Sequence, residues 1–152
     1  MPDGDPTVTR LLIDTSVLIK WFHSEGESEL REARVIRAAH LSGEVVAHIL
    51  DLGVYEVGNL LVRSLGWSAQ EVGDQLDDLF TICGTPLVTS PPWLREAAAL
   101  ATEHQLSFYD AAWAAAARSL DLTLVSSDAK LLEANLAEAP SDVVRRLRLT
   151  GR

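Results

Sequence analysis

The stretch from Thr9 to Ile19 reads TRLLIDTSVLI, two apolar runs joined through one acidic residue, Asp14. Residues 9–13 have the composition of a buried strand, and a short helix is predicted from about Ser16 to Phe22. A lone carboxylate at such a junction needs an explanation, because burying an unpaired charge costs several kcal/mol. In α/β folds, ligands bind just beyond the carboxyl ends of the strands, which is where Asp14 would lie.

Outward from this stretch, helical and strand patterns alternate along the chain. Ser68 and Glu71 form a capping-box pattern at the start of one helix, and glycines Gly43 and Gly66 follow two others. Alternation of this kind implies a mostly parallel sheet with helices on both faces. The predicted helices cover 27–41, 51–65, 68–83, a segment starting at 91, 107–120 and 128–137, and the predicted strands cover 44–47, 85–89, 122–125 and 143–149.

The composition is that of one small globular protein. With 152 residues and 47% hydrophobic residues, we expect residues 9–152 to form a single domain behind a flexible tail of residues 1–8. No apolar stretch is long enough to span a bilayer, and the N-terminus lacks a signal-peptide pattern, so a cytoplasmic protein without a membrane segment is expected. Cys83 is the only cysteine, which excludes an internal disulfide and a cysteine-based zinc site.

The charge is strongly negative, at −9 with a sequence pI near 4.8. This balance argues against a general nucleic-acid binder, which usually carries a basic face. Two groups of arginines could still bind the phosphates of a nucleic acid, although a solvent-exposed surface explains them more readily. These groups are Arg145, Arg146, Arg148 and Arg152, and Arg31, Arg34 and Arg37.

Three further carboxylates, Glu56, Asp110 and Asp128, also lie in or directly after apolar segments. Asp14 and Asp128 follow predicted strands, and the other two lie early in predicted helices, so all four can meet at one edge of the sheet. Carboxylates brought close together raise one another's pKa unless a cation neutralises them. Mg²⁺ and Mn²⁺ prefer such oxygen ligands, so the pattern predicts a metal-dependent hydrolase.

Three of these acids have a simpler structural interpretation at a helix start. Asp14 could cap the helix that follows it, because Asp is favoured at that position. Asp110 lies three residues after Ser107 in a pattern that resembles a capping pair. Asp128 could be a first-turn acid that complements the helix dipole.

Glu56 is harder to explain in this way. It lies inside a predicted helix with Leu52 and Leu60 one turn away on either side, so the charge is surrounded by apolar residues. Asn59 falls nearly one turn later and is placed to hold the carboxylate by a hydrogen bond.

Four segments together carry a family resemblance: LIDTSVLI at 12–19, YEVGN at 55–59, SFYDAAW at 107–113 and LVSSDAKL at 124–131. In this order and at these separations they resemble PIN-domain endoribonucleases and, among them, the VapC-like toxins of toxin–antitoxin pairs. The resemblance extends from Leu11 to about Arg148.

The resemblance implies a three-layer α/β/α sandwich that binds Mg²⁺ or Mn²⁺ and cleaves single-stranded RNA, or structured RNA, to 5′-phosphate and 3′-hydroxyl ends. It also implies a homodimer and a small antitoxin protein as partner. The site residues it implies are the catalytic and metal-binding acids Asp14, Glu56, Asp110 and Asp128, and the site-lining hydroxyls Thr15, Ser16 and Ser126.

Other functions remain open at this point. A PIN fold could act as a housekeeping RNA-processing nuclease, or could have lost activity and serve as an RNA-binding or protein-binding module. An aspartyl phosphatase usually has a second acid two residues after the first, where this chain has Ser16. The aromatic residues Trp21, Phe22 and Trp67 are interpreted as core residues, with an exposed dimer or antitoxin groove as the alternative.

Overall fold

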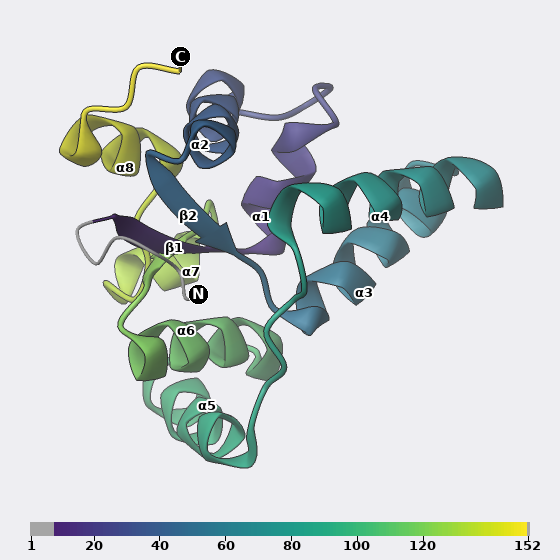
Figure 1. Ribbon diagram of the computed structural model, residues 1–152. Coiled ribbons are helices and arrows are strands. Elements are labelled where there is room, and N and C mark those ends of the chain that lie inside the picture. The colour runs from purple at the N-terminus through teal and green to yellow at the C-terminus, as the bar shows by residue number, and fades with distance from the viewer. Residues whose placement is uncertain (1–7, 152) are drawn as a thin grey trace.

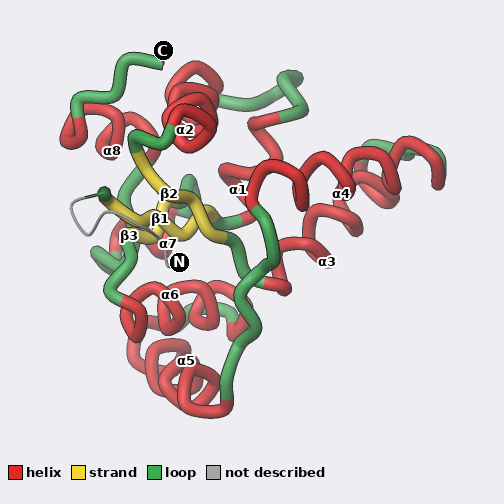
Figure 2. Tube along the Cα trace, in the orientation of Figure 1, coloured by secondary structure: helices red, strands yellow, loops and turns green. Residues whose placement is uncertain are grey.

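The computed structural model describes residues 8–151, so all of the predicted N-terminal tail except Val8 lies outside the described residues. Within the described residues, helices alternate with three short strands. Figures 1 and 2 show how these elements are arranged. The elements are β1 (Thr9–Ile13), α1 (Thr15–Leu18), the 3₁₀ turn η1 (Ile19–Trp21), α2 (Leu30–Ser42), β2 (Val45–His48), α3 (Asp51–Asn59), the π-helical turn η2 (Leu60–Ser64), α4 (Ala69–Cys83), α5 (Pro91–His104), α6 (Phe108–Leu120), β3 (Thr123–Val125), α7 (Ala129–Glu133) and α8 (Pro140–Leu147).

The sheet has the order β2-β1-β3, with both pairs parallel and β1 in the centre. Side chains alternate between the two faces of β1, because successive residues of a strand point in opposite directions. Leu11 and Ile13 belong to a core shared with α2 and α8, whereas Leu12 belongs to a second core shared with α5 and α6. Figure 1 shows these helix pairs on opposite sides of the sheet. The predicted three-layer α/β/α fold is therefore confirmed.

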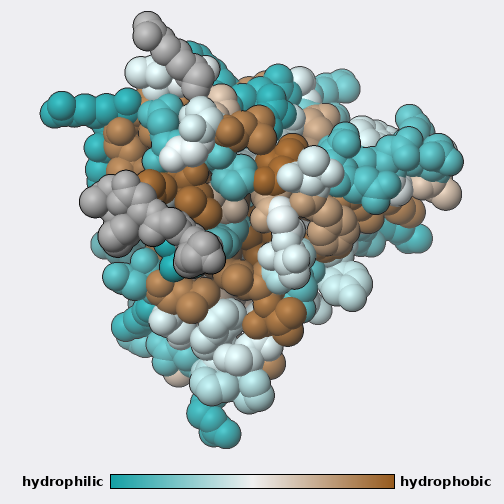
Figure 3. Space-filling model, viewed as in Figure 1, coloured by the Kyte–Doolittle hydropathy of each residue, from teal (hydrophilic) through white to brown (hydrophobic). Residues whose placement is uncertain are grey.

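The second core depends on small side chains. All residues from Ala111 to Ala117 of α6, of which only Trp113 is not alanine, are buried between the sheet and α5. Alanines allow helices and strands to approach closely, and Trp113 fills the space that remains. On the face shown in Figure 3, hydrophilic residues spread over the outer surface and apolar residues gather towards the middle.

Local signals explain several boundaries. The Ser68–Glu71 capping box is present: the Glu71 N–H donates to Ser68 Oγ (3.2 Å), and the Ser68 N–H donates to Glu71 Oε1 (2.9 Å). Helix α2 ends at Gly43, whose φ of 86° is left-handed and suits glycine.

The predicted final strand over 143–149 is wrong, because this segment forms most of α8. Pro140 stands in the first turn of the helix, Asp142 lies near its N-terminal end and Arg145 near its C-terminal end, as the helix dipole favours. Val143 is fully buried, and Val144 and Leu147 pack against the same core. Residues 143–149 include two valines, which are common in strands. However, Val144 and Leu147 follow Val143 by one and four residues, and this spacing also fits one side of a helix.

The predicted strand over 85–89 is reduced to one parallel bridge between Leu50 and Leu87. The Leu87 N–H donates to the Ile49 carbonyl (2.8 Å), and the Asp51 N–H donates to the Leu87 carbonyl (2.9 Å). Pro86 has no N–H to offer, which limits the pairing to this short contact. The helix predicted over 128–137 is also shorter and ends at Glu133, before Asn135 with its φ of 57°.

The aromatic residues singled out in the sequence pack as core residues. Trp21 is buried, and Phe22 and Trp67 pack against the core that includes α2. Cys83 packs there as well, and burial raises the pKa of its thiol to about 12, so the thiol stays protonated at neutral pH. Within residues 8–151, no helix has the length and apolar character needed to cross a membrane.

Candidate active site

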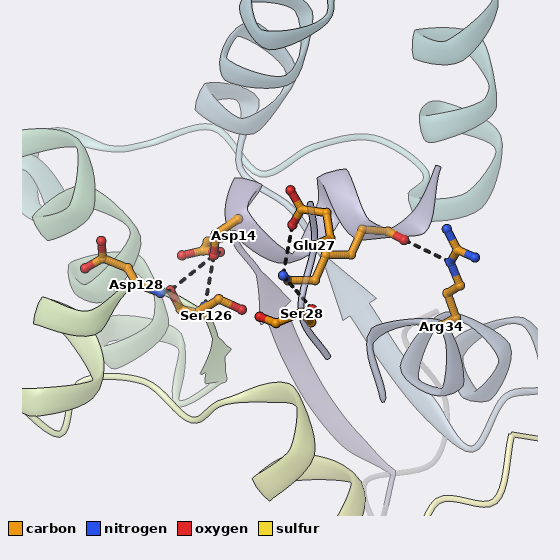
Figure 4. Close-up of polar contacts among 9 residues, drawn as sticks. Asp14, Glu27, Ser28, Arg34, Ser126 and Asp128 are labelled. Atoms are coloured by element: carbon orange, nitrogen blue, oxygen red, sulfur yellow. Dashed lines mark hydrogen bonds and ion pairs between the residues drawn. The ribbon is translucent and has the colours of Figure 1, made fainter. Parts of the chain in front are cut away.

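Asp14 lies directly after the central strand β1 and is 4% exposed. Ser16 Oγ donates to Asp14 Oδ1 at 2.5 Å, and Ser126 also hydrogen-bonds the carboxylate. Figure 4 shows Asp14, Ser126 and Asp128 grouped together. Burial raises the pKa of Asp14 to about 6; the bonds from Ser126 and Ser16 and the nearby Val17 N–H oppose this, and the charge of Asp110 adds to it. The carboxylate forms no regular cap hydrogen bond with α1, so capping alone does not explain this residue.

Ser16 joins the loop after β1 to the loop after β3. Besides donating to Asp14, its Oγ accepts a hydrogen bond from the Ser127 N–H at 2.9 Å. Ser126 Oγ in turn accepts from the Asp128 N–H at 3.0 Å. The predicted hydroxyls Ser16 and Ser126 thus connect the segments that carry Asp14 and Asp128.

Glu56 lies on α3 and is held by two other elements. Its Oε1 accepts a hydrogen bond from Thr15 Oγ1 on α1 (2.8 Å) and another from Trp113 Nε1 on α6 (3.0 Å). Asn59, the partner suggested by helical spacing, is exposed and takes no part in these bonds. The position of the Glu56 carboxylate therefore depends on residues far away in the sequence.

Asp110 is the acid that interacts electrostatically with each of the other three. It lies in the first turn of α6, where its N–H donates to the capping Ser107 Oγ at 3.0 Å. Burial raises the pKa of Asp110 first, and the charges of Asp128 and Glu56 raise it further; Ser107 and Lys130 lower it. Asp110 likewise raises the pKa of Asp14. The carboxylates therefore repel one another, as carboxylates do in a site that binds a cation.

Asp128 is the N-cap of α7 and not a first-turn acid, although a carboxylate at this position also complements the helix dipole. Its Oδ2 accepts a hydrogen bond from the Leu131 N–H at 3.0 Å. None of the hydrogen bonds found among residues 8–151 uses its other oxygen, Oδ1. One Asp side chain can therefore cap a helix and still have one oxygen available to a ligand.

The donor chemistry of the four acids fits a divalent cation. In the part of the chain that the structure describes, none of the four forms an ion pair with a base; the buried Lys20 is paired with Glu27 (2.9 Å; Figure 4). Ser127 Oγ, next to Asp128, is buried without a hydrogen-bond partner among the described residues. As these side chains stand, no three His, Cys, Asp or Glu residues within 8–151 are close enough to hold one ion, so the fit rests on charge and donor type.

The family profile described as "PIN domain" matches residues 11–136. The chain belongs to the PIN-domain family. Ribonuclease VapC3 from Pyrobaculum aerophilum is 32% identical over 128 residues, which cover 82% of this PIN domain and 93% of the relative. The resemblance to PIN-domain proteins of the VapC kind is therefore confirmed.

Solved structures agree with the fold of this PIN domain. The crystal structure of PAE2754 from Pyrobaculum aerophilum has a TM-score of 0.65 and 26% identity, covering 94% of this chain and 98% of that one. A toxin–antitoxin complex from Klebsiella pneumoniae contains a chain with a TM-score of 0.63 and 21% identity, covering 86% and 97% respectively. The second likeness concerns the fold alone.

Sequence reasoning missed one part of the site in this PIN domain. Trp113 was included in the third segment of the resemblance, but nothing in the sequence assigned it a partner. Its spacing of three from Asp110 gave a signal, since residues three apart on a helix lie on one side. Its partner Glu56 lies 57 residues away, beyond the reach of any local pattern.

Proposed function

We propose that this PIN domain is an endoribonuclease that depends on Mg²⁺ or Mn²⁺, cleaves single-stranded RNA, and is the toxin of a toxin–antitoxin pair. The observation that carries the proposal is the electrostatic coupling of Asp14, Glu56 and Asp128 through Asp110 without a paired base. The name of the relative Ribonuclease VapC3 supports the choice of RNA as substrate.

In the proposed mechanism, the four acids would hold a divalent cation, which would supply polarisation of the scissile phosphate and activation of a water molecule. Ser16 and Ser126 keep Asp14 oriented, and Thr15 does so for Glu56. Asp128, anchored to α7 through Oδ2, has Oδ1 to accept a proton from the attacking water. Water attacks phosphorus, the bond to the 3′ oxygen breaks, and that oxygen takes up a proton from solvent, which leaves 5′-phosphate and 3′-hydroxyl ends.

The proposed antitoxin partner has chemical support in a groove that includes residues of α3. An apolar groove of about 300 Å³ is lined by residues that include Val54, Tyr55, Phe80 and Val88. Tyr55 and Val88 are 76% and 71% exposed, and Tyr55 is adjacent to Glu56. Exposed apolar residues that line a groove favour contact with another protein. The homodimer belongs to the same proposal and rests on the resemblance, and a cytoplasmic location is proposed with it.

The test is cleavage of a panel of single-stranded and structured RNAs by the purified protein with Mg²⁺, Mn²⁺ or EDTA. Asp14→Asn removes the buried carboxylate, and Asp77→Asn makes the same change at an exposed position on α4. We expect cleavage that requires metal, is lost in Asp14→Asn and is kept in Asp77→Asn. Full activity of Asp14→Asn would contradict the assignment of the site.

Two alternatives have distinct outcomes. A protein that neither cleaves RNA nor binds Mn²⁺ would be the inactive binding module. A housekeeping nuclease would cleave RNA, but its expression would not arrest growth in an Asp14-dependent manner. A toxin is expected to arrest growth, and a small antitoxin encoded beside it should relieve the arrest.

A further inference from the structure

Trp113 is a buried tryptophan whose indole N–H meets a carboxylate of the proposed metal site. The residue is 2% exposed, and its Nε1 lies 3.0 Å from Glu56 Oε1. A buried indole N–H needs a hydrogen-bond partner, and most backbone or side-chain acceptors would serve. Here the acceptor is one of the four acids, so the packing of Trp113 and the geometry of the site are linked.

The same carboxylate oxygen has a second donor. Thr15 Oγ1 lies 2.8 Å from Glu56 Oε1, so α1 and α6 each contribute one hydrogen bond to it. Hydrogen bonds to an ionised acceptor are stronger than neutral ones, and two of them from different directions restrict the rotation of the side chain. None of the hydrogen bonds within 8–151 engages Oε2, which is the oxygen left to face a ligand.

Gly53 provides the space for the indole ring. It lies on α3 one turn before Glu56, and a Cβ at this position would come within 2.9 Å of Trp113 Cη2 and 3.1 Å of Cζ2. Contacts this short are not tolerated, so any larger residue would displace the ring. Glycine is unfavourable inside a helix, and the close approach of Trp113 explains its presence. The ring thus rests on the helix that carries Glu56, while its own helix carries Asp110.

We propose that Trp113 is a positioning residue that, together with Thr15, fixes Glu56 Oε1 and thereby orients Oε2 towards the shared cation. Gly53 makes this arrangement possible. The inference rests on the proposed metal-dependent function and assigns a role to a residue that does not itself touch the metal. Partners that hold metal ligands in place commonly contribute 10- to 100-fold to metal affinity.

The test is Mn²⁺ binding to the purified protein in the absence of RNA, measured through the electron paramagnetic resonance signal of the free ion. Trp113→Phe keeps an aromatic ring but removes the N–H, and we expect it to weaken Mn²⁺ binding by about 10- to 100-fold. Trp21→Phe is the matched control, because Trp21 is equally buried and donates its Nε1–H to the Ala33 carbonyl (2.9 Å). The control should bind Mn²⁺ like the wild-type protein, while urea unfolding shows that both variants fold.

A double-mutant comparison separates positioning from general loss of structure. If Trp113 acts through Glu56, Trp113→Phe should have no further effect on Mn²⁺ binding in a Glu56→Ala background. Likewise, Thr15→Ser should keep the affinity and Thr15→Val should lower it. Equal losses with and without the Glu56 carboxylate would overturn the proposal.

A measurement on the unsubstituted protein completes the test should a variant fail to fold. Addition of diamagnetic Mg²⁺ should shift the indole N–H resonance of Trp113 and leave that of Trp21 in place. Wild-type protein that binds metal with an unmoved Trp113 resonance, or unchanged affinity in Trp113→Phe, would overturn this inference alone. Wild-type protein that binds no metal would overturn the proposed function and this inference with it.

Discussion

The buried carboxylate of Asp14 makes the stability of the metal-free protein dependent on pH. Burial raises its pKa from 3.8 to about 6. Between these two values the folded protein keeps a proton on Asp14 that the unfolded chain has already released. Folding in this window therefore requires uptake of a proton, so the free energy of unfolding falls as the pH rises from about 4 to about 6.

The size of the effect follows from the shift. A change of roughly two pKa units corresponds to about 3 kcal/mol. This amount is fully lost above the folded-state pKa, at neutral pH. Asn at position 14 does not titrate, so the stability of the metal-free Asp14→Asn variant should not fall in this way as the pH rises. At pH 7.5 the variant is expected to be more stable than the wild-type protein by up to about 3 kcal/mol, and near pH 4 the two should be similar.

The assay is urea unfolding in EDTA at several pH values between 4 and 7.5, followed by tryptophan fluorescence. Asp77→Asn, at an exposed position, should follow the wild-type protein to within about 0.5 kcal/mol at every pH. The informative quantity is the difference between Asp14→Asn and wild type. A difference that stays constant with pH, or that favours the wild-type protein increasingly at higher pH, would refute the reasoning.

Two further predictions concern the metal and the core. Mn²⁺ at 100 times its dissociation constant should stabilise the wild-type protein by about 2.7 kcal/mol at pH 7.5. The same Mn²⁺ concentration should stabilise it less at pH 5, because the carboxylate ligands must lose their protons to bind the ion. Thermal melts with and without the ion measure both effects, and no metal-linked change at any pH would contradict a cation site. Gly53→Ala should destabilise by roughly 1–3 kcal/mol through its clash with Trp113. Gly73→Ala, where a Cβ meets nothing within 4 Å, should instead stabilise α4 by about 0.5–1 kcal/mol; equal effects in urea unfolding would show that the clash is absent.

The central strand could be predicted because its sequence leaves little choice. Leu11, Leu12 and Ile13 are all fully buried, as expected for a strand with a helix layer on each side. The segment 143–149 lacked such a clear pattern, and its packing against α2 determines that it is helical. Whether segment 85–89 forms a strand depends on how many of its residues pair with a neighbouring segment, and only Leu87 does so. This pairing is a property of the assembled sheet.

The four acids of the candidate site and the hydroxyls of Thr15, Ser16 and Ser126 could be singled out from the sequence, but the partners of Glu56 could not. Each acid interrupts an apolar segment, and this is visible in the sequence alone. The partner of Glu56 is different, because local spacing favoured Asn59, whereas the fold brings Thr15 and Trp113 to the carboxylate. Helical periodicity describes neighbours within one helix, and here the donors come from two other elements.

The position of β1 at the centre of the sheet has a consequence for biosynthesis. One of its neighbours, β2, is made soon after it, but the other, β3, comes from the far end of the matched region. Asp128 follows β3, so a growing chain that has not yet emerged beyond this point lacks both the strand and the fourth acid. Domains fold as units during translation, and parallel pairing across such a separation forms late. A nascent chain of the proposed nuclease would thus remain harmless to the message from which it is being translated until β3 and Asp128 had emerged from the ribosome.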